Sequence, residues 1–124
     1  MKRFVFSLIA ALPVMMTACG APEGYESVTA DKFAEVLSDT TVQLVDVRTP
    51  QEYAAGNIAG SVNIDVKGDD FAGEALKKLD KKRVVAVYCR SGRRSKKAAG
   101  ILASEGFKVV ELDTGYIGWV ESGR

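Results

Sequence analysis

The chain has 124 residues, of which 47% are hydrophobic, and this length and apolar fraction suit one domain with a buried core. Its 17 Lys and Arg nearly balance 16 Asp and Glu, so the net charge of +1 does not favour nucleic-acid binding. The sequence has no histidine and two cysteines, which excludes a Cys–His catalytic pair and argues against a zinc site. We therefore expect no metal and no cofactor.

The first 27 residues have the pattern of an export signal followed by a tether. A basic pair precedes the apolar stretch 4–16, which is too short for a comfortable membrane span, and small residues follow it before Cys19. We therefore expect a signal peptide over 1–18 and a short flexible tether over 19–27. The folded domain would then occupy 28–124.

The residues Met16-Thr17-Ala18-Cys19 resemble the lipobox of bacterial lipoproteins, with Met16 where leucine is usual. This resemblance implies cleavage before Cys19, a lipid on its sulfur, and anchoring on the periplasmic side of a bacterial membrane. Ordinary secretion and an uncleaved anchor are the alternatives. With Cys19 acylated, Cys89 would be the only free thiol, so we expect no intramolecular disulfide and expect a thiol-redox protein as a partner.

The chain then alternates helix and strand patterns. Thr29 is placed to cap a helix over 30–37, and the mostly apolar run 42–47 is typical of a strand covered on both faces. The segment Thr49-Pro50-Gln51-Glu52 predicts a helix that opens with a capping box. A turn and a short strand are expected within 56–64.

The second half continues this alternation. We expect a helix within 68–82, a strand over 84–88, a helix over 95–105 and a strand over 108–112. Phe71, Leu76 and Leu79 are expected to contact the core, and Trp119 to anchor the closing segment in it. Alternating strands and helices predict an α/β fold with a central parallel sheet.

A strand, a loop and a helix are predicted to meet at one thiol. The strand 84–88 runs into Cys89, and the loop Arg90-Ser91-Gly92-Arg93-Arg94 leads to the helix that begins at Ser95. Loop amides and the first turn of a helix favour an anion, and five Lys and Arg follow the cysteine within eight positions. These features favour the reactive thiolate of Cys89. The alternative is a buried structural cysteine followed by a solvated basic turn.

Asp46 and Arg48 lie where the strand 42–47 is predicted to end. Because the carboxyl ends of parallel strands share one edge of a sheet, we expect these residues to border the same crevice as Cys89. They would either support the Cys89 loop from behind, or form a turn at Asp46 and an ion pair between Arg48 and Glu52. The turn and the ion pair are favoured.

Four segments resemble, in the same order, the motifs of the rhodanese family of sulfurtransferases. Cys89-Arg90-Ser91-Gly92-Arg93-Arg94-Ser95 resembles the active-site loop of this family. Similar matches are 44–53 to D-V-R…E-[FY], 56–64 to G-H-I-x-G-A-x-N-I with Asn57 in place of histidine, and 112–119 to L-x-G-G-[IYF]-x-x-W. The resemblance covers about 28–123 and implies a rhodanese-like domain, in which helices flank both faces of a small parallel sheet.

The loop chemistry and the resemblance together predict a thiosulfate sulfurtransferase. Cys89 would attack the outer sulfur of thiosulfate or a similar small anionic donor, sulfite would leave, and the persulfide would pass its sulfur to cyanide or a thiol. Arg94 would close over the anion, while Arg90 and Arg93 would attract it. The residues predicted to bind the donor are Arg90, Ser91, Gly92, Arg93, Arg94 and Ser95.

Two other functions would use the same residues. A cysteine-dependent phosphatase or arsenate reductase also holds a thiolate in a loop that ends in arginine, but with the spacing Cys-x5-Arg instead of the Cys-x4-Arg from Cys89 to Arg94. The shorter loop favours transfer of a single sulfur atom over chemistry on a tetrahedral oxyanion. The second alternative is a membrane-tethered carrier or binding module that forms a persulfide without efficient turnover.

Overall fold

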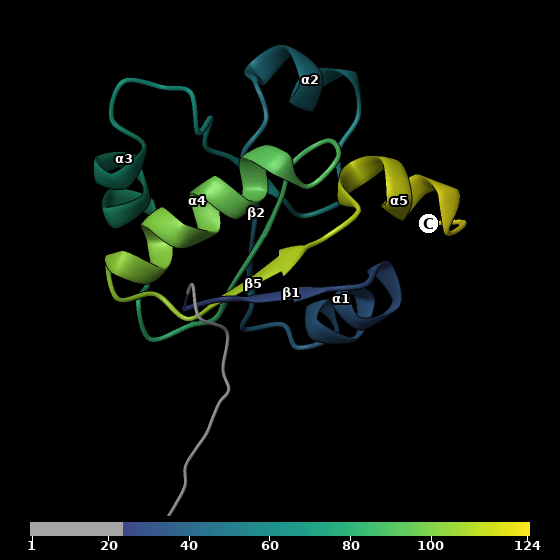
Figure 1. Cartoon of the computed structure of the whole chain (residues 1–124), viewed down its shortest axis with the longest axis horizontal. Coiled ribbons are helices and arrows are strands. Elements are labelled where there is room, and N and C mark those ends of the chain that lie inside the picture. The colour runs from purple at the N-terminus through teal and green to yellow at the C-terminus, as the bar shows by residue number, and fades with distance from the viewer. Residues whose placement is uncertain (1–23) are drawn as a thin grey trace, which may run out of the picture.

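The computed structural model describes residues 24–124, and Figure 1 shows how its helices and strands are arranged. The predicted signal peptide, the predicted lipid-bearing Cys19 and the first part of the predicted tether lie outside the described residues and stay predictions. Between residues 24 and 124, no helix is both long enough and apolar enough to cross a membrane.

Five parallel strands form one central sheet in the order β1-β5-β4-β2-β3. The strands are β1 (Glu26–Val28), β2 (Gln43–Asp46), β3 (Val62–Asn63), β4 (Val85–Tyr88) and β5 (Val109–Leu112). β4 lies between β2 and β5, and all of its residues are buried. Because the strands are parallel, the carboxyl ends of β2, β4 and β5 lie along the same edge of the sheet.

Helices cover both faces of this sheet (Figure 1). One face packs against α3 (Phe71–Lys78) and α4 (Arg93–Ser104), and the other packs against α1 (Ala30–Leu37) and α5 (Gly115–Glu121). The short α2 (Pro50–Ala55) is joined by an ion pair to the first turn of α4. The arrangement confirms the predicted α/β fold, with helices on both faces of a parallel sheet.

The side chains of β4 alternate between two buried clusters, as the pleat of a strand requires. Val85 and Val87 pack with residues of α3 and α4, whereas Ala86 and Tyr88 pack with Phe33 of α1. Burial on both faces is the reason that this strand is a continuous apolar run in the sequence. Cys89, which follows β4, is therefore attached to a tightly packed strand.

The helix α4 begins earlier than predicted. The sequence pattern places its start at Ser95, whereas the helix begins at Arg93. Gly92 takes the cap position in a left-handed conformation with φ 101°, which turns the chain into the helix two residues sooner. Arg93 and Arg94 therefore lie in the first turn of α4 and not in the loop.

One of the predicted core contacts is wrong. Phe71 is buried and Leu79 packs against the core as predicted, but Leu76 is 44% exposed. Leu76 lies on the solvent side of α3, because the face that includes Phe71 is the one turned to the sheet. Trp119 packs edge-on against Phe33, with 6.0 Å between ring centroids, so its predicted place in the core is confirmed.

The sequence pattern predicts no strand before residue 30, yet β1 pairs with β5. Glu26 and Ser27, at the end of the predicted tether, are therefore part of the sheet. Only Val28 in this strand is buried, so no apolar alternation marks the segment in the sequence. Its strand conformation depends on the pairing with β5.

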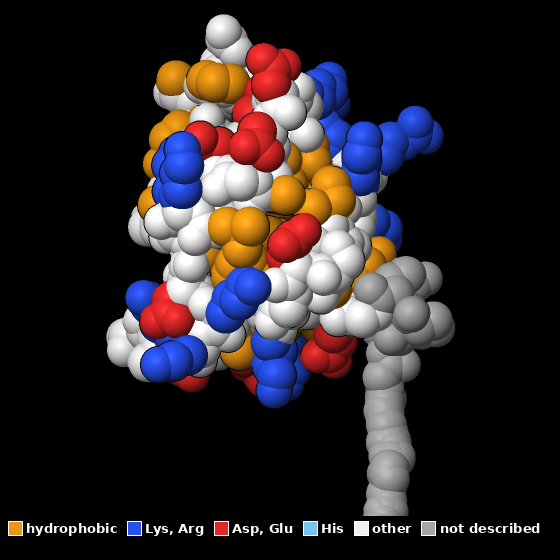
Figure 2. Space-filling view, turned by 90° about the vertical axis from the view of Figure 1, so that its left-hand side faces the viewer, with side chains coloured by type: hydrophobic (Ala, Val, Ile, Leu, Met, Phe, Trp, Pro, Cys, Tyr) orange, Lys and Arg blue, Asp and Glu red, His pale blue; other side chains and the backbone are white. Residues whose placement is uncertain are grey.

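The surface mixes charges of both signs. On the face shown in Figure 2, Lys and Arg are interspersed with Asp and Glu around exposed hydrophobic atoms. This mixture agrees with the nearly equal counts of 17 basic and 16 acidic residues in the sequence. The run of basic residues after Cys89 is therefore a local feature of its loop and of the first turns of α4.

Candidate active site

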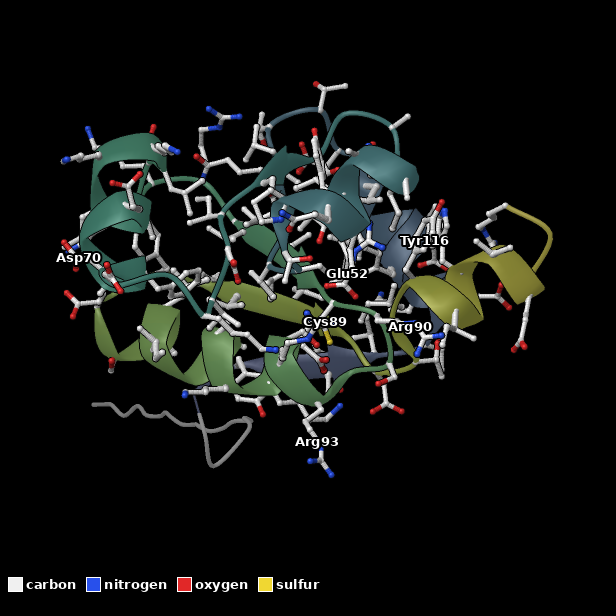
Figure 3. All side chains as sticks on the ribbon, turned by 90° about the horizontal axis from the view of Figure 1, so that it is seen from above. Glu52, Asp70, Cys89, Arg90, Arg93 and Tyr116 are labelled. Atoms are coloured by element: carbon white, nitrogen blue, oxygen red, sulfur yellow. The ribbon has the colours of Figure 1, made fainter. Side chains whose placement is uncertain are left out.

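Cys89 lies directly after β4, at the carboxyl edge of the sheet, and only 1% of its surface is exposed. Figure 3 shows it near the middle of the molecule, close to Glu52 and Arg90. The amides of Tyr116 and Ile117 in α5 donate to the carbonyl oxygens of Cys89 and Arg90, at 2.8 and 3.1 Å. The backbone of Cys89 is therefore held in place both by the strand before it and by α5.

Two glycines shape the loop after Cys89. Gly92 has φ 101°, and a Cβ there would clash with the carbonyl oxygen of Asp113. Gly115 has φ 65°, and a Cβ there would clash with the carbonyl group of Arg90. Because only glycine fits these two positions, the loop closes tightly around the sulfur. The N–H of Gly92 donates to Cys89 Sγ at 3.1 Å.

A buried chain of hydrogen bonds leads away from the sulfur. Cys89 Sγ donates to Ser95 Oγ at 3.3 Å, and Ser95 Oγ donates to Glu111 Oε2 at 2.5 Å. Ser27 Oγ donates to the other carboxylate oxygen, Glu111 Oε1, at 2.5 Å. Ser95 and Glu111 are both fully buried. Ser95, which the sequence predicts to bind the donor, therefore contacts the sulfur but gives its own hydrogen to Glu111.

Glu111 is a site residue that the sequence analysis missed. It lies on β5 within the otherwise apolar run 109–112, and Lys96 Nζ lies 3.4 Å from its Oε1. A lone acid in a strand that is buried on both faces must have buried partners, which is the signal that could have revealed it. The same Lys96 lies 2.8 Å from Asp113, and their hydrogen bond lowers the pKa of Asp113.

Arg94 forms a two-point ion pair with Glu52. Its Nη1 and Nη2 donate to Glu52 Oε1 and Oε2 at 2.7 and 2.9 Å. These hydrogen bonds lower the pKa of Glu52 to about 2 and raise the pKa of Arg94, to which the nearby Cys89 sulfur also contributes. Glu52 completes the predicted capping box of α2 with Thr49, which is confirmed. The predicted closure of Arg94 over an anion stays a prediction, since its guanidinium is engaged here.

Asp46 and Arg48 form a buried ion pair at the end of β2. Arg48 Nη2 lies 2.6 Å from Asp46 Oδ2 and also donates to the carbonyl oxygen of Gly56. The backbone N–H of Arg48 donates to Asp46 Oδ1 at 2.9 Å, so the predicted turn at Asp46 is confirmed. The predicted ion pair of Arg48 with Glu52 is wrong, because Glu52 is occupied by Arg94.

The buried pair reaches the Cys89 loop through an aromatic ring. The guanidinium of Arg48 lies 4.6 Å from the ring centroid of Tyr116, whose amide holds the Cys89 carbonyl. Burial opposes the charge of Arg48, but the hydrogen bonds to Asp46 outweigh it and raise the pKa of Arg48. Asp46 and Arg48 therefore approach the Cys89 loop through Tyr116, and their predicted support of that loop stays a prediction.

Arg90, Ser91 and Arg93 lie on the outside of the loop and are exposed. Figure 3 shows Arg93 pointing away from Cys89. In the part of the chain that the structure describes, neither Arg90 nor Arg93 forms an ion pair. An open cavity of about 760 Å³ beside the loop is lined by Ser91, Arg93 and Lys96, among others. The acids Asp113 and Glu121 also line this cavity, and Cys89 does not. Arg90 and Arg93, which we call the rim of the site, are therefore the exposed arginines of the loop sequence that carry unpaired positive charge.

The described residues include a free thiol and no cluster of side chains that could bind a metal ion. Over residues 24–124, no group of three or more His, Cys, Asp or Glu side chains is placed to hold a metal ion. Cys89 is a free cysteine with an amide donor, a hydroxyl partner and nearby cations. Such an arrangement suits a nucleophilic sulfur that works beside an anion.

Comparisons with known proteins agree with this geometry. Residues 29–122 match the rhodanese-like domain. A sulfurtransferase of Allochromatium vinosum is 34% identical over 98 residues, which are 77% of this chain and 89% of that protein. The thiosulfate sulfurtransferase GlpE of Pseudomonas paraeruginosa is 37% identical over 92 residues, which are 73% of this chain and 80% of that protein.

The fold is matched by solved structures as well. A rhodanese-related protein from Thermoplasma volcanium superimposes with a TM-score of 0.69 at 32% identity, covering 80% of this chain and 94% of that one. A tRNA uridine(34) hydroxylase of Acaryochloris marina is 33% identical over 100 residues, but the chain spans only 32% of its length. The chain thus belongs to the rhodanese-like domain family, and its relatives of similar length include sulfurtransferases.

Proposed function

We propose that this protein is a thiosulfate sulfurtransferase that carries the transferred sulfur as a Cys89 persulfide. The observation that carries the proposal is the free thiol at the end of β4, enclosed by its own loop, with two exposed arginines on the outside of that loop that form no ion pair among the described residues. A small anionic sulfur donor would be drawn to these two residues, Arg90 and Arg93. A relative of similar length, GlpE, is named as a thiosulfate sulfurtransferase.

The first half-reaction transfers one sulfur atom. The Cys89 thiolate attacks the outer sulfur of thiosulfate, a bond forms between the two sulfurs, and sulfite leaves with the electron pair of the broken S–S bond. The Gly92 amide and the amino end of α4 favour the negative sulfur before and after the attack. The product is a persulfide held within the loop.

The second half-reaction removes the transferred sulfur from the enzyme. A thiolate acceptor, or cyanide in an assay, attacks the terminal sulfur, and Cys89 leaves as a thiolate. Donor and acceptor therefore react in turn, which predicts ping-pong kinetics. A persulfide carrier would complete the first half-reaction but would turn over slowly with excess donor and acceptor.

The phosphatase alternative is less well supported. A phosphate-transferring loop needs an arginine that faces the oxyanion, and the arginine at the corresponding place is Arg94. Both ends of its guanidinium are engaged by Glu52 at 2.7 and 2.9 Å. The loop between Cys89 and Arg94 is also one residue shorter than the Cys-x5-Arg pattern. The pairing occupies the arginine that a phosphatase would need, and the shorter loop favours sulfur transfer.

We also propose that the protein works outside the cytoplasm. Residues 1–18 would be removed, Cys19 would carry the lipid, and the short segment up to β1 would tether the domain to the membrane. A thiol-redox protein in that compartment would keep Cys89 reduced.

The intact mass of the protein tests the persulfide directly. The full chain with Cys19→Ser, in which Cys89 is the only thiol, is weighed before thiosulfate, after thiosulfate and after cyanide. We expect a gain of one sulfur atom that cyanide removes, and no gain when Cys89→Ser is added. Steady-state thiocyanate formation then separates an enzyme from a carrier. The absence of a sulfur adduct on the Cys89 protein would contradict the proposal.

A further inference from the structure

Glu111, the buried acid on β5, takes no part in the proposed sulfur transfer. Glu111 is fully buried, and both of its oxygens accept a serine hydroxyl at 2.5 Å, from Ser95 and from Ser27. Lys96 Nζ lies 3.4 Å from Oε1. Two donated hydroxyls and a neighbouring ammonium group are the partners that an ionised carboxylate requires. Glu111 is therefore held as an acceptor of hydrogen bonds.

The consequence for Cys89 follows from the hydroxyl of Ser95. A serine hydroxyl has one hydrogen, and here that hydrogen is donated to Glu111. The Ser95 oxygen can then only accept a hydrogen bond from the sulfur that lies 3.3 Å away. A sulfur that donates to this oxygen must carry a proton. The hydrogen-bond direction thus favours the thiol of Cys89, against the Gly92 amide, which favours the thiolate.

Arg90 and Arg93 are exposed on the outside of the loop and form no ion pair among the described residues, whereas the charged groups packed closer to Cys89 and Glu111 are paired. These pairs are Lys96 with Asp113, Arg94 of α4 with Glu52 of α2, and Arg48 with Asp46 at the end of β2. β1 contributes the neutral hydroxyl of Ser27. Among the described side chains, Glu111 is thus the acid that reaches the sulfur through a single intervening group.

We propose that Glu111 is a positioning residue that acts through Ser95: it holds the Ser95 hydrogen away from Cys89 and so keeps the resting cysteine as a thiol. The role in turnover rests on the proposed function, since persulfide formation needs the thiolate. Glu111 would thereby set the pH at which the thiolate becomes available. It would also protect the resting sulfur, because a thiol is oxidised less readily than a thiolate.

The test is a pH titration of the thiolate by its ultraviolet absorbance. The full chain with Cys19→Ser is compared with the same chain carrying Glu111→Gln, and the Cys89→Ser protein is subtracted as a blank. Glutamine has nearly the same shape, and when its oxygen faces Ser27 and Lys96 its amide nitrogen donates to Ser95 Oγ, which leaves the Ser95 hydrogen free to turn to the sulfur. We expect the midpoint of the titration to fall by about one pH unit, as one new hydrogen bond to the charged form allows. An unchanged or raised midpoint would overturn the proposal.

The path through Ser95 needs a separate comparison. In a Ser95→Ala background, Glu111→Gln should lower the midpoint by less than half as much as it does with Ser95 present. An equal shift in both backgrounds would mean that the charge acts directly on the sulfur, which contradicts the proposed path. Asp113→Asn removes a charge from the same Lys96 pair without touching Ser95, so we expect it to shift the midpoint far less. A shift as large as that of Glu111→Gln would also overturn the proposal.

A change at the exposed Ser27 provides a second test, which leaves Glu111 itself in place. Ser27→Ala, on the edge strand β1, removes one donor from Glu111 and makes the carboxylate a stronger acceptor for Ser95. The midpoint should then rise, in the opposite direction to Glu111→Gln. If circular dichroism shows that Glu111→Gln does not fold, Ser27→Ala tests the proposal in its place. A midpoint that does not rise in Ser27→Ala would contradict the proposal.

The titration uses no sulfur donor, so its outcome is independent of the proposed reaction. A midpoint that shifts as expected in a protein that forms no persulfide would leave the role of Glu111 standing and remove the sulfurtransferase function. A persulfide together with an unchanged midpoint would support the sulfurtransferase function and overturn the proposed role of Glu111. Where both hold, the acid limb of the pH–rate profile with thiosulfate should move to lower pH in Glu111→Gln by the same amount.

Discussion

The three arginines of the loop sequence differ in what their side chains contact. Arg94 is half-buried and paired with Glu52, whereas Arg90 and Arg93 are exposed. A paired guanidinium has its charge largely satisfied, so attraction of an anion falls to the unpaired ones. Figure 3 shows that Arg93 points away from Cys89. Under the proposed function, individual residues of one basic run would therefore have different roles.

This division predicts the kinetics of charge-removing variants. Arg90→Gln should raise the KM for thiosulfate by about 2–5-fold with little change in kcat, and Arg93→Gln should do so to a smaller extent. Both effects should fade as salt is added, because screening weakens attraction between exposed charges. Lys82→Gln, an exposed change just before the other end of β4, is the control. An equal effect of Lys82→Gln would show that net charge, and not the rim, draws the donor.

At the scale of elements, an ion pair and two glycines decide how the site is enclosed. Glu52 caps α2 and at the same time holds Arg94 in the first turn of α4. Gly92 ends the loop in a conformation that lets α4 begin beside the sulfur. Helix α5 closes the other side through the amide of Tyr116. Four elements, β4, α2, α4 and α5, therefore meet at Cys89.

The Glu52–Arg94 pair should make stability depend on pH. The pKa of Glu52 falls from 4.5 to about 2 on folding, so its contribution is fully present above pH 4.5 and is lost as the pH falls towards 2. Glu52→Gln should therefore lower the free energy of unfolding near neutral pH by about 1 kcal/mol, and the difference should vanish near pH 2. Urea unfolding at several pH values measures this. The control Glu35→Gln, in an exposed pair with Lys32, should show no such pH-dependent loss.

The two kinds of glycine in this region predict opposite effects on stability. Gly92→Ala should lower the free energy of unfolding by about 2 kcal/mol or more, because φ is 101° and the Cβ meets the Asp113 carbonyl. Sulfur transfer should be lost with it. Gly100→Ala, in the middle of α4 with open space around its Cβ, should instead be stabilising by about 0.5 kcal/mol. Thermal unfolding compares them, and a neutral Gly92→Ala would refute the account of the loop.

At the scale of the whole molecule, the domain combines a mixed surface with a local cluster of basic residues beside the Cys89 loop. Under the proposed function, the balanced charge would leave steering of the donor to the rim of this loop. β1 is one of the two edge strands of the sheet and includes the last two residues of the predicted tether, so a membrane anchor would join the fold at its edge. Cys89 lies at the carboxyl end of the central β4, away from the edge strand.

The membrane anchor is tested in a bacterium that processes lipoproteins. We expect the full chain to incorporate labelled fatty acid, to lose residues 1–18 and to fractionate with membranes. Cys19→Ser should lose the label and the membrane association, while Cys89→Ser should keep both. A wild-type chain found in the cytoplasmic fraction with residues 1–18 still attached would contradict export.

Local patterns in the sequence were sufficient for most of the fold. The apolar runs that became β2, β4 and β5, the cap at Thr49 and the helix Ala30–Leu37 depend on periodicity and nearest neighbours, which the sequence contains. The thiol between strand and loop was also evident, because its neighbours in sequence are its neighbours in space. Sequence alone therefore determined the α/β architecture and the candidate nucleophile.

Partners that are distant in the sequence were decided only by the tertiary structure. Glu52 pairs with Arg94 across 42 positions and not with Arg48, and Ser95 finds Glu111 across 16. β1 exists as a strand only because β5 lies beside it. A charged side chain can pair with any opposite charge that the fold brings near. The spacing of residues in the sequence does not show which of these pairs will form. The candidate nucleophile was therefore readable from the chain, while the side chains that pair around it were decided by packing.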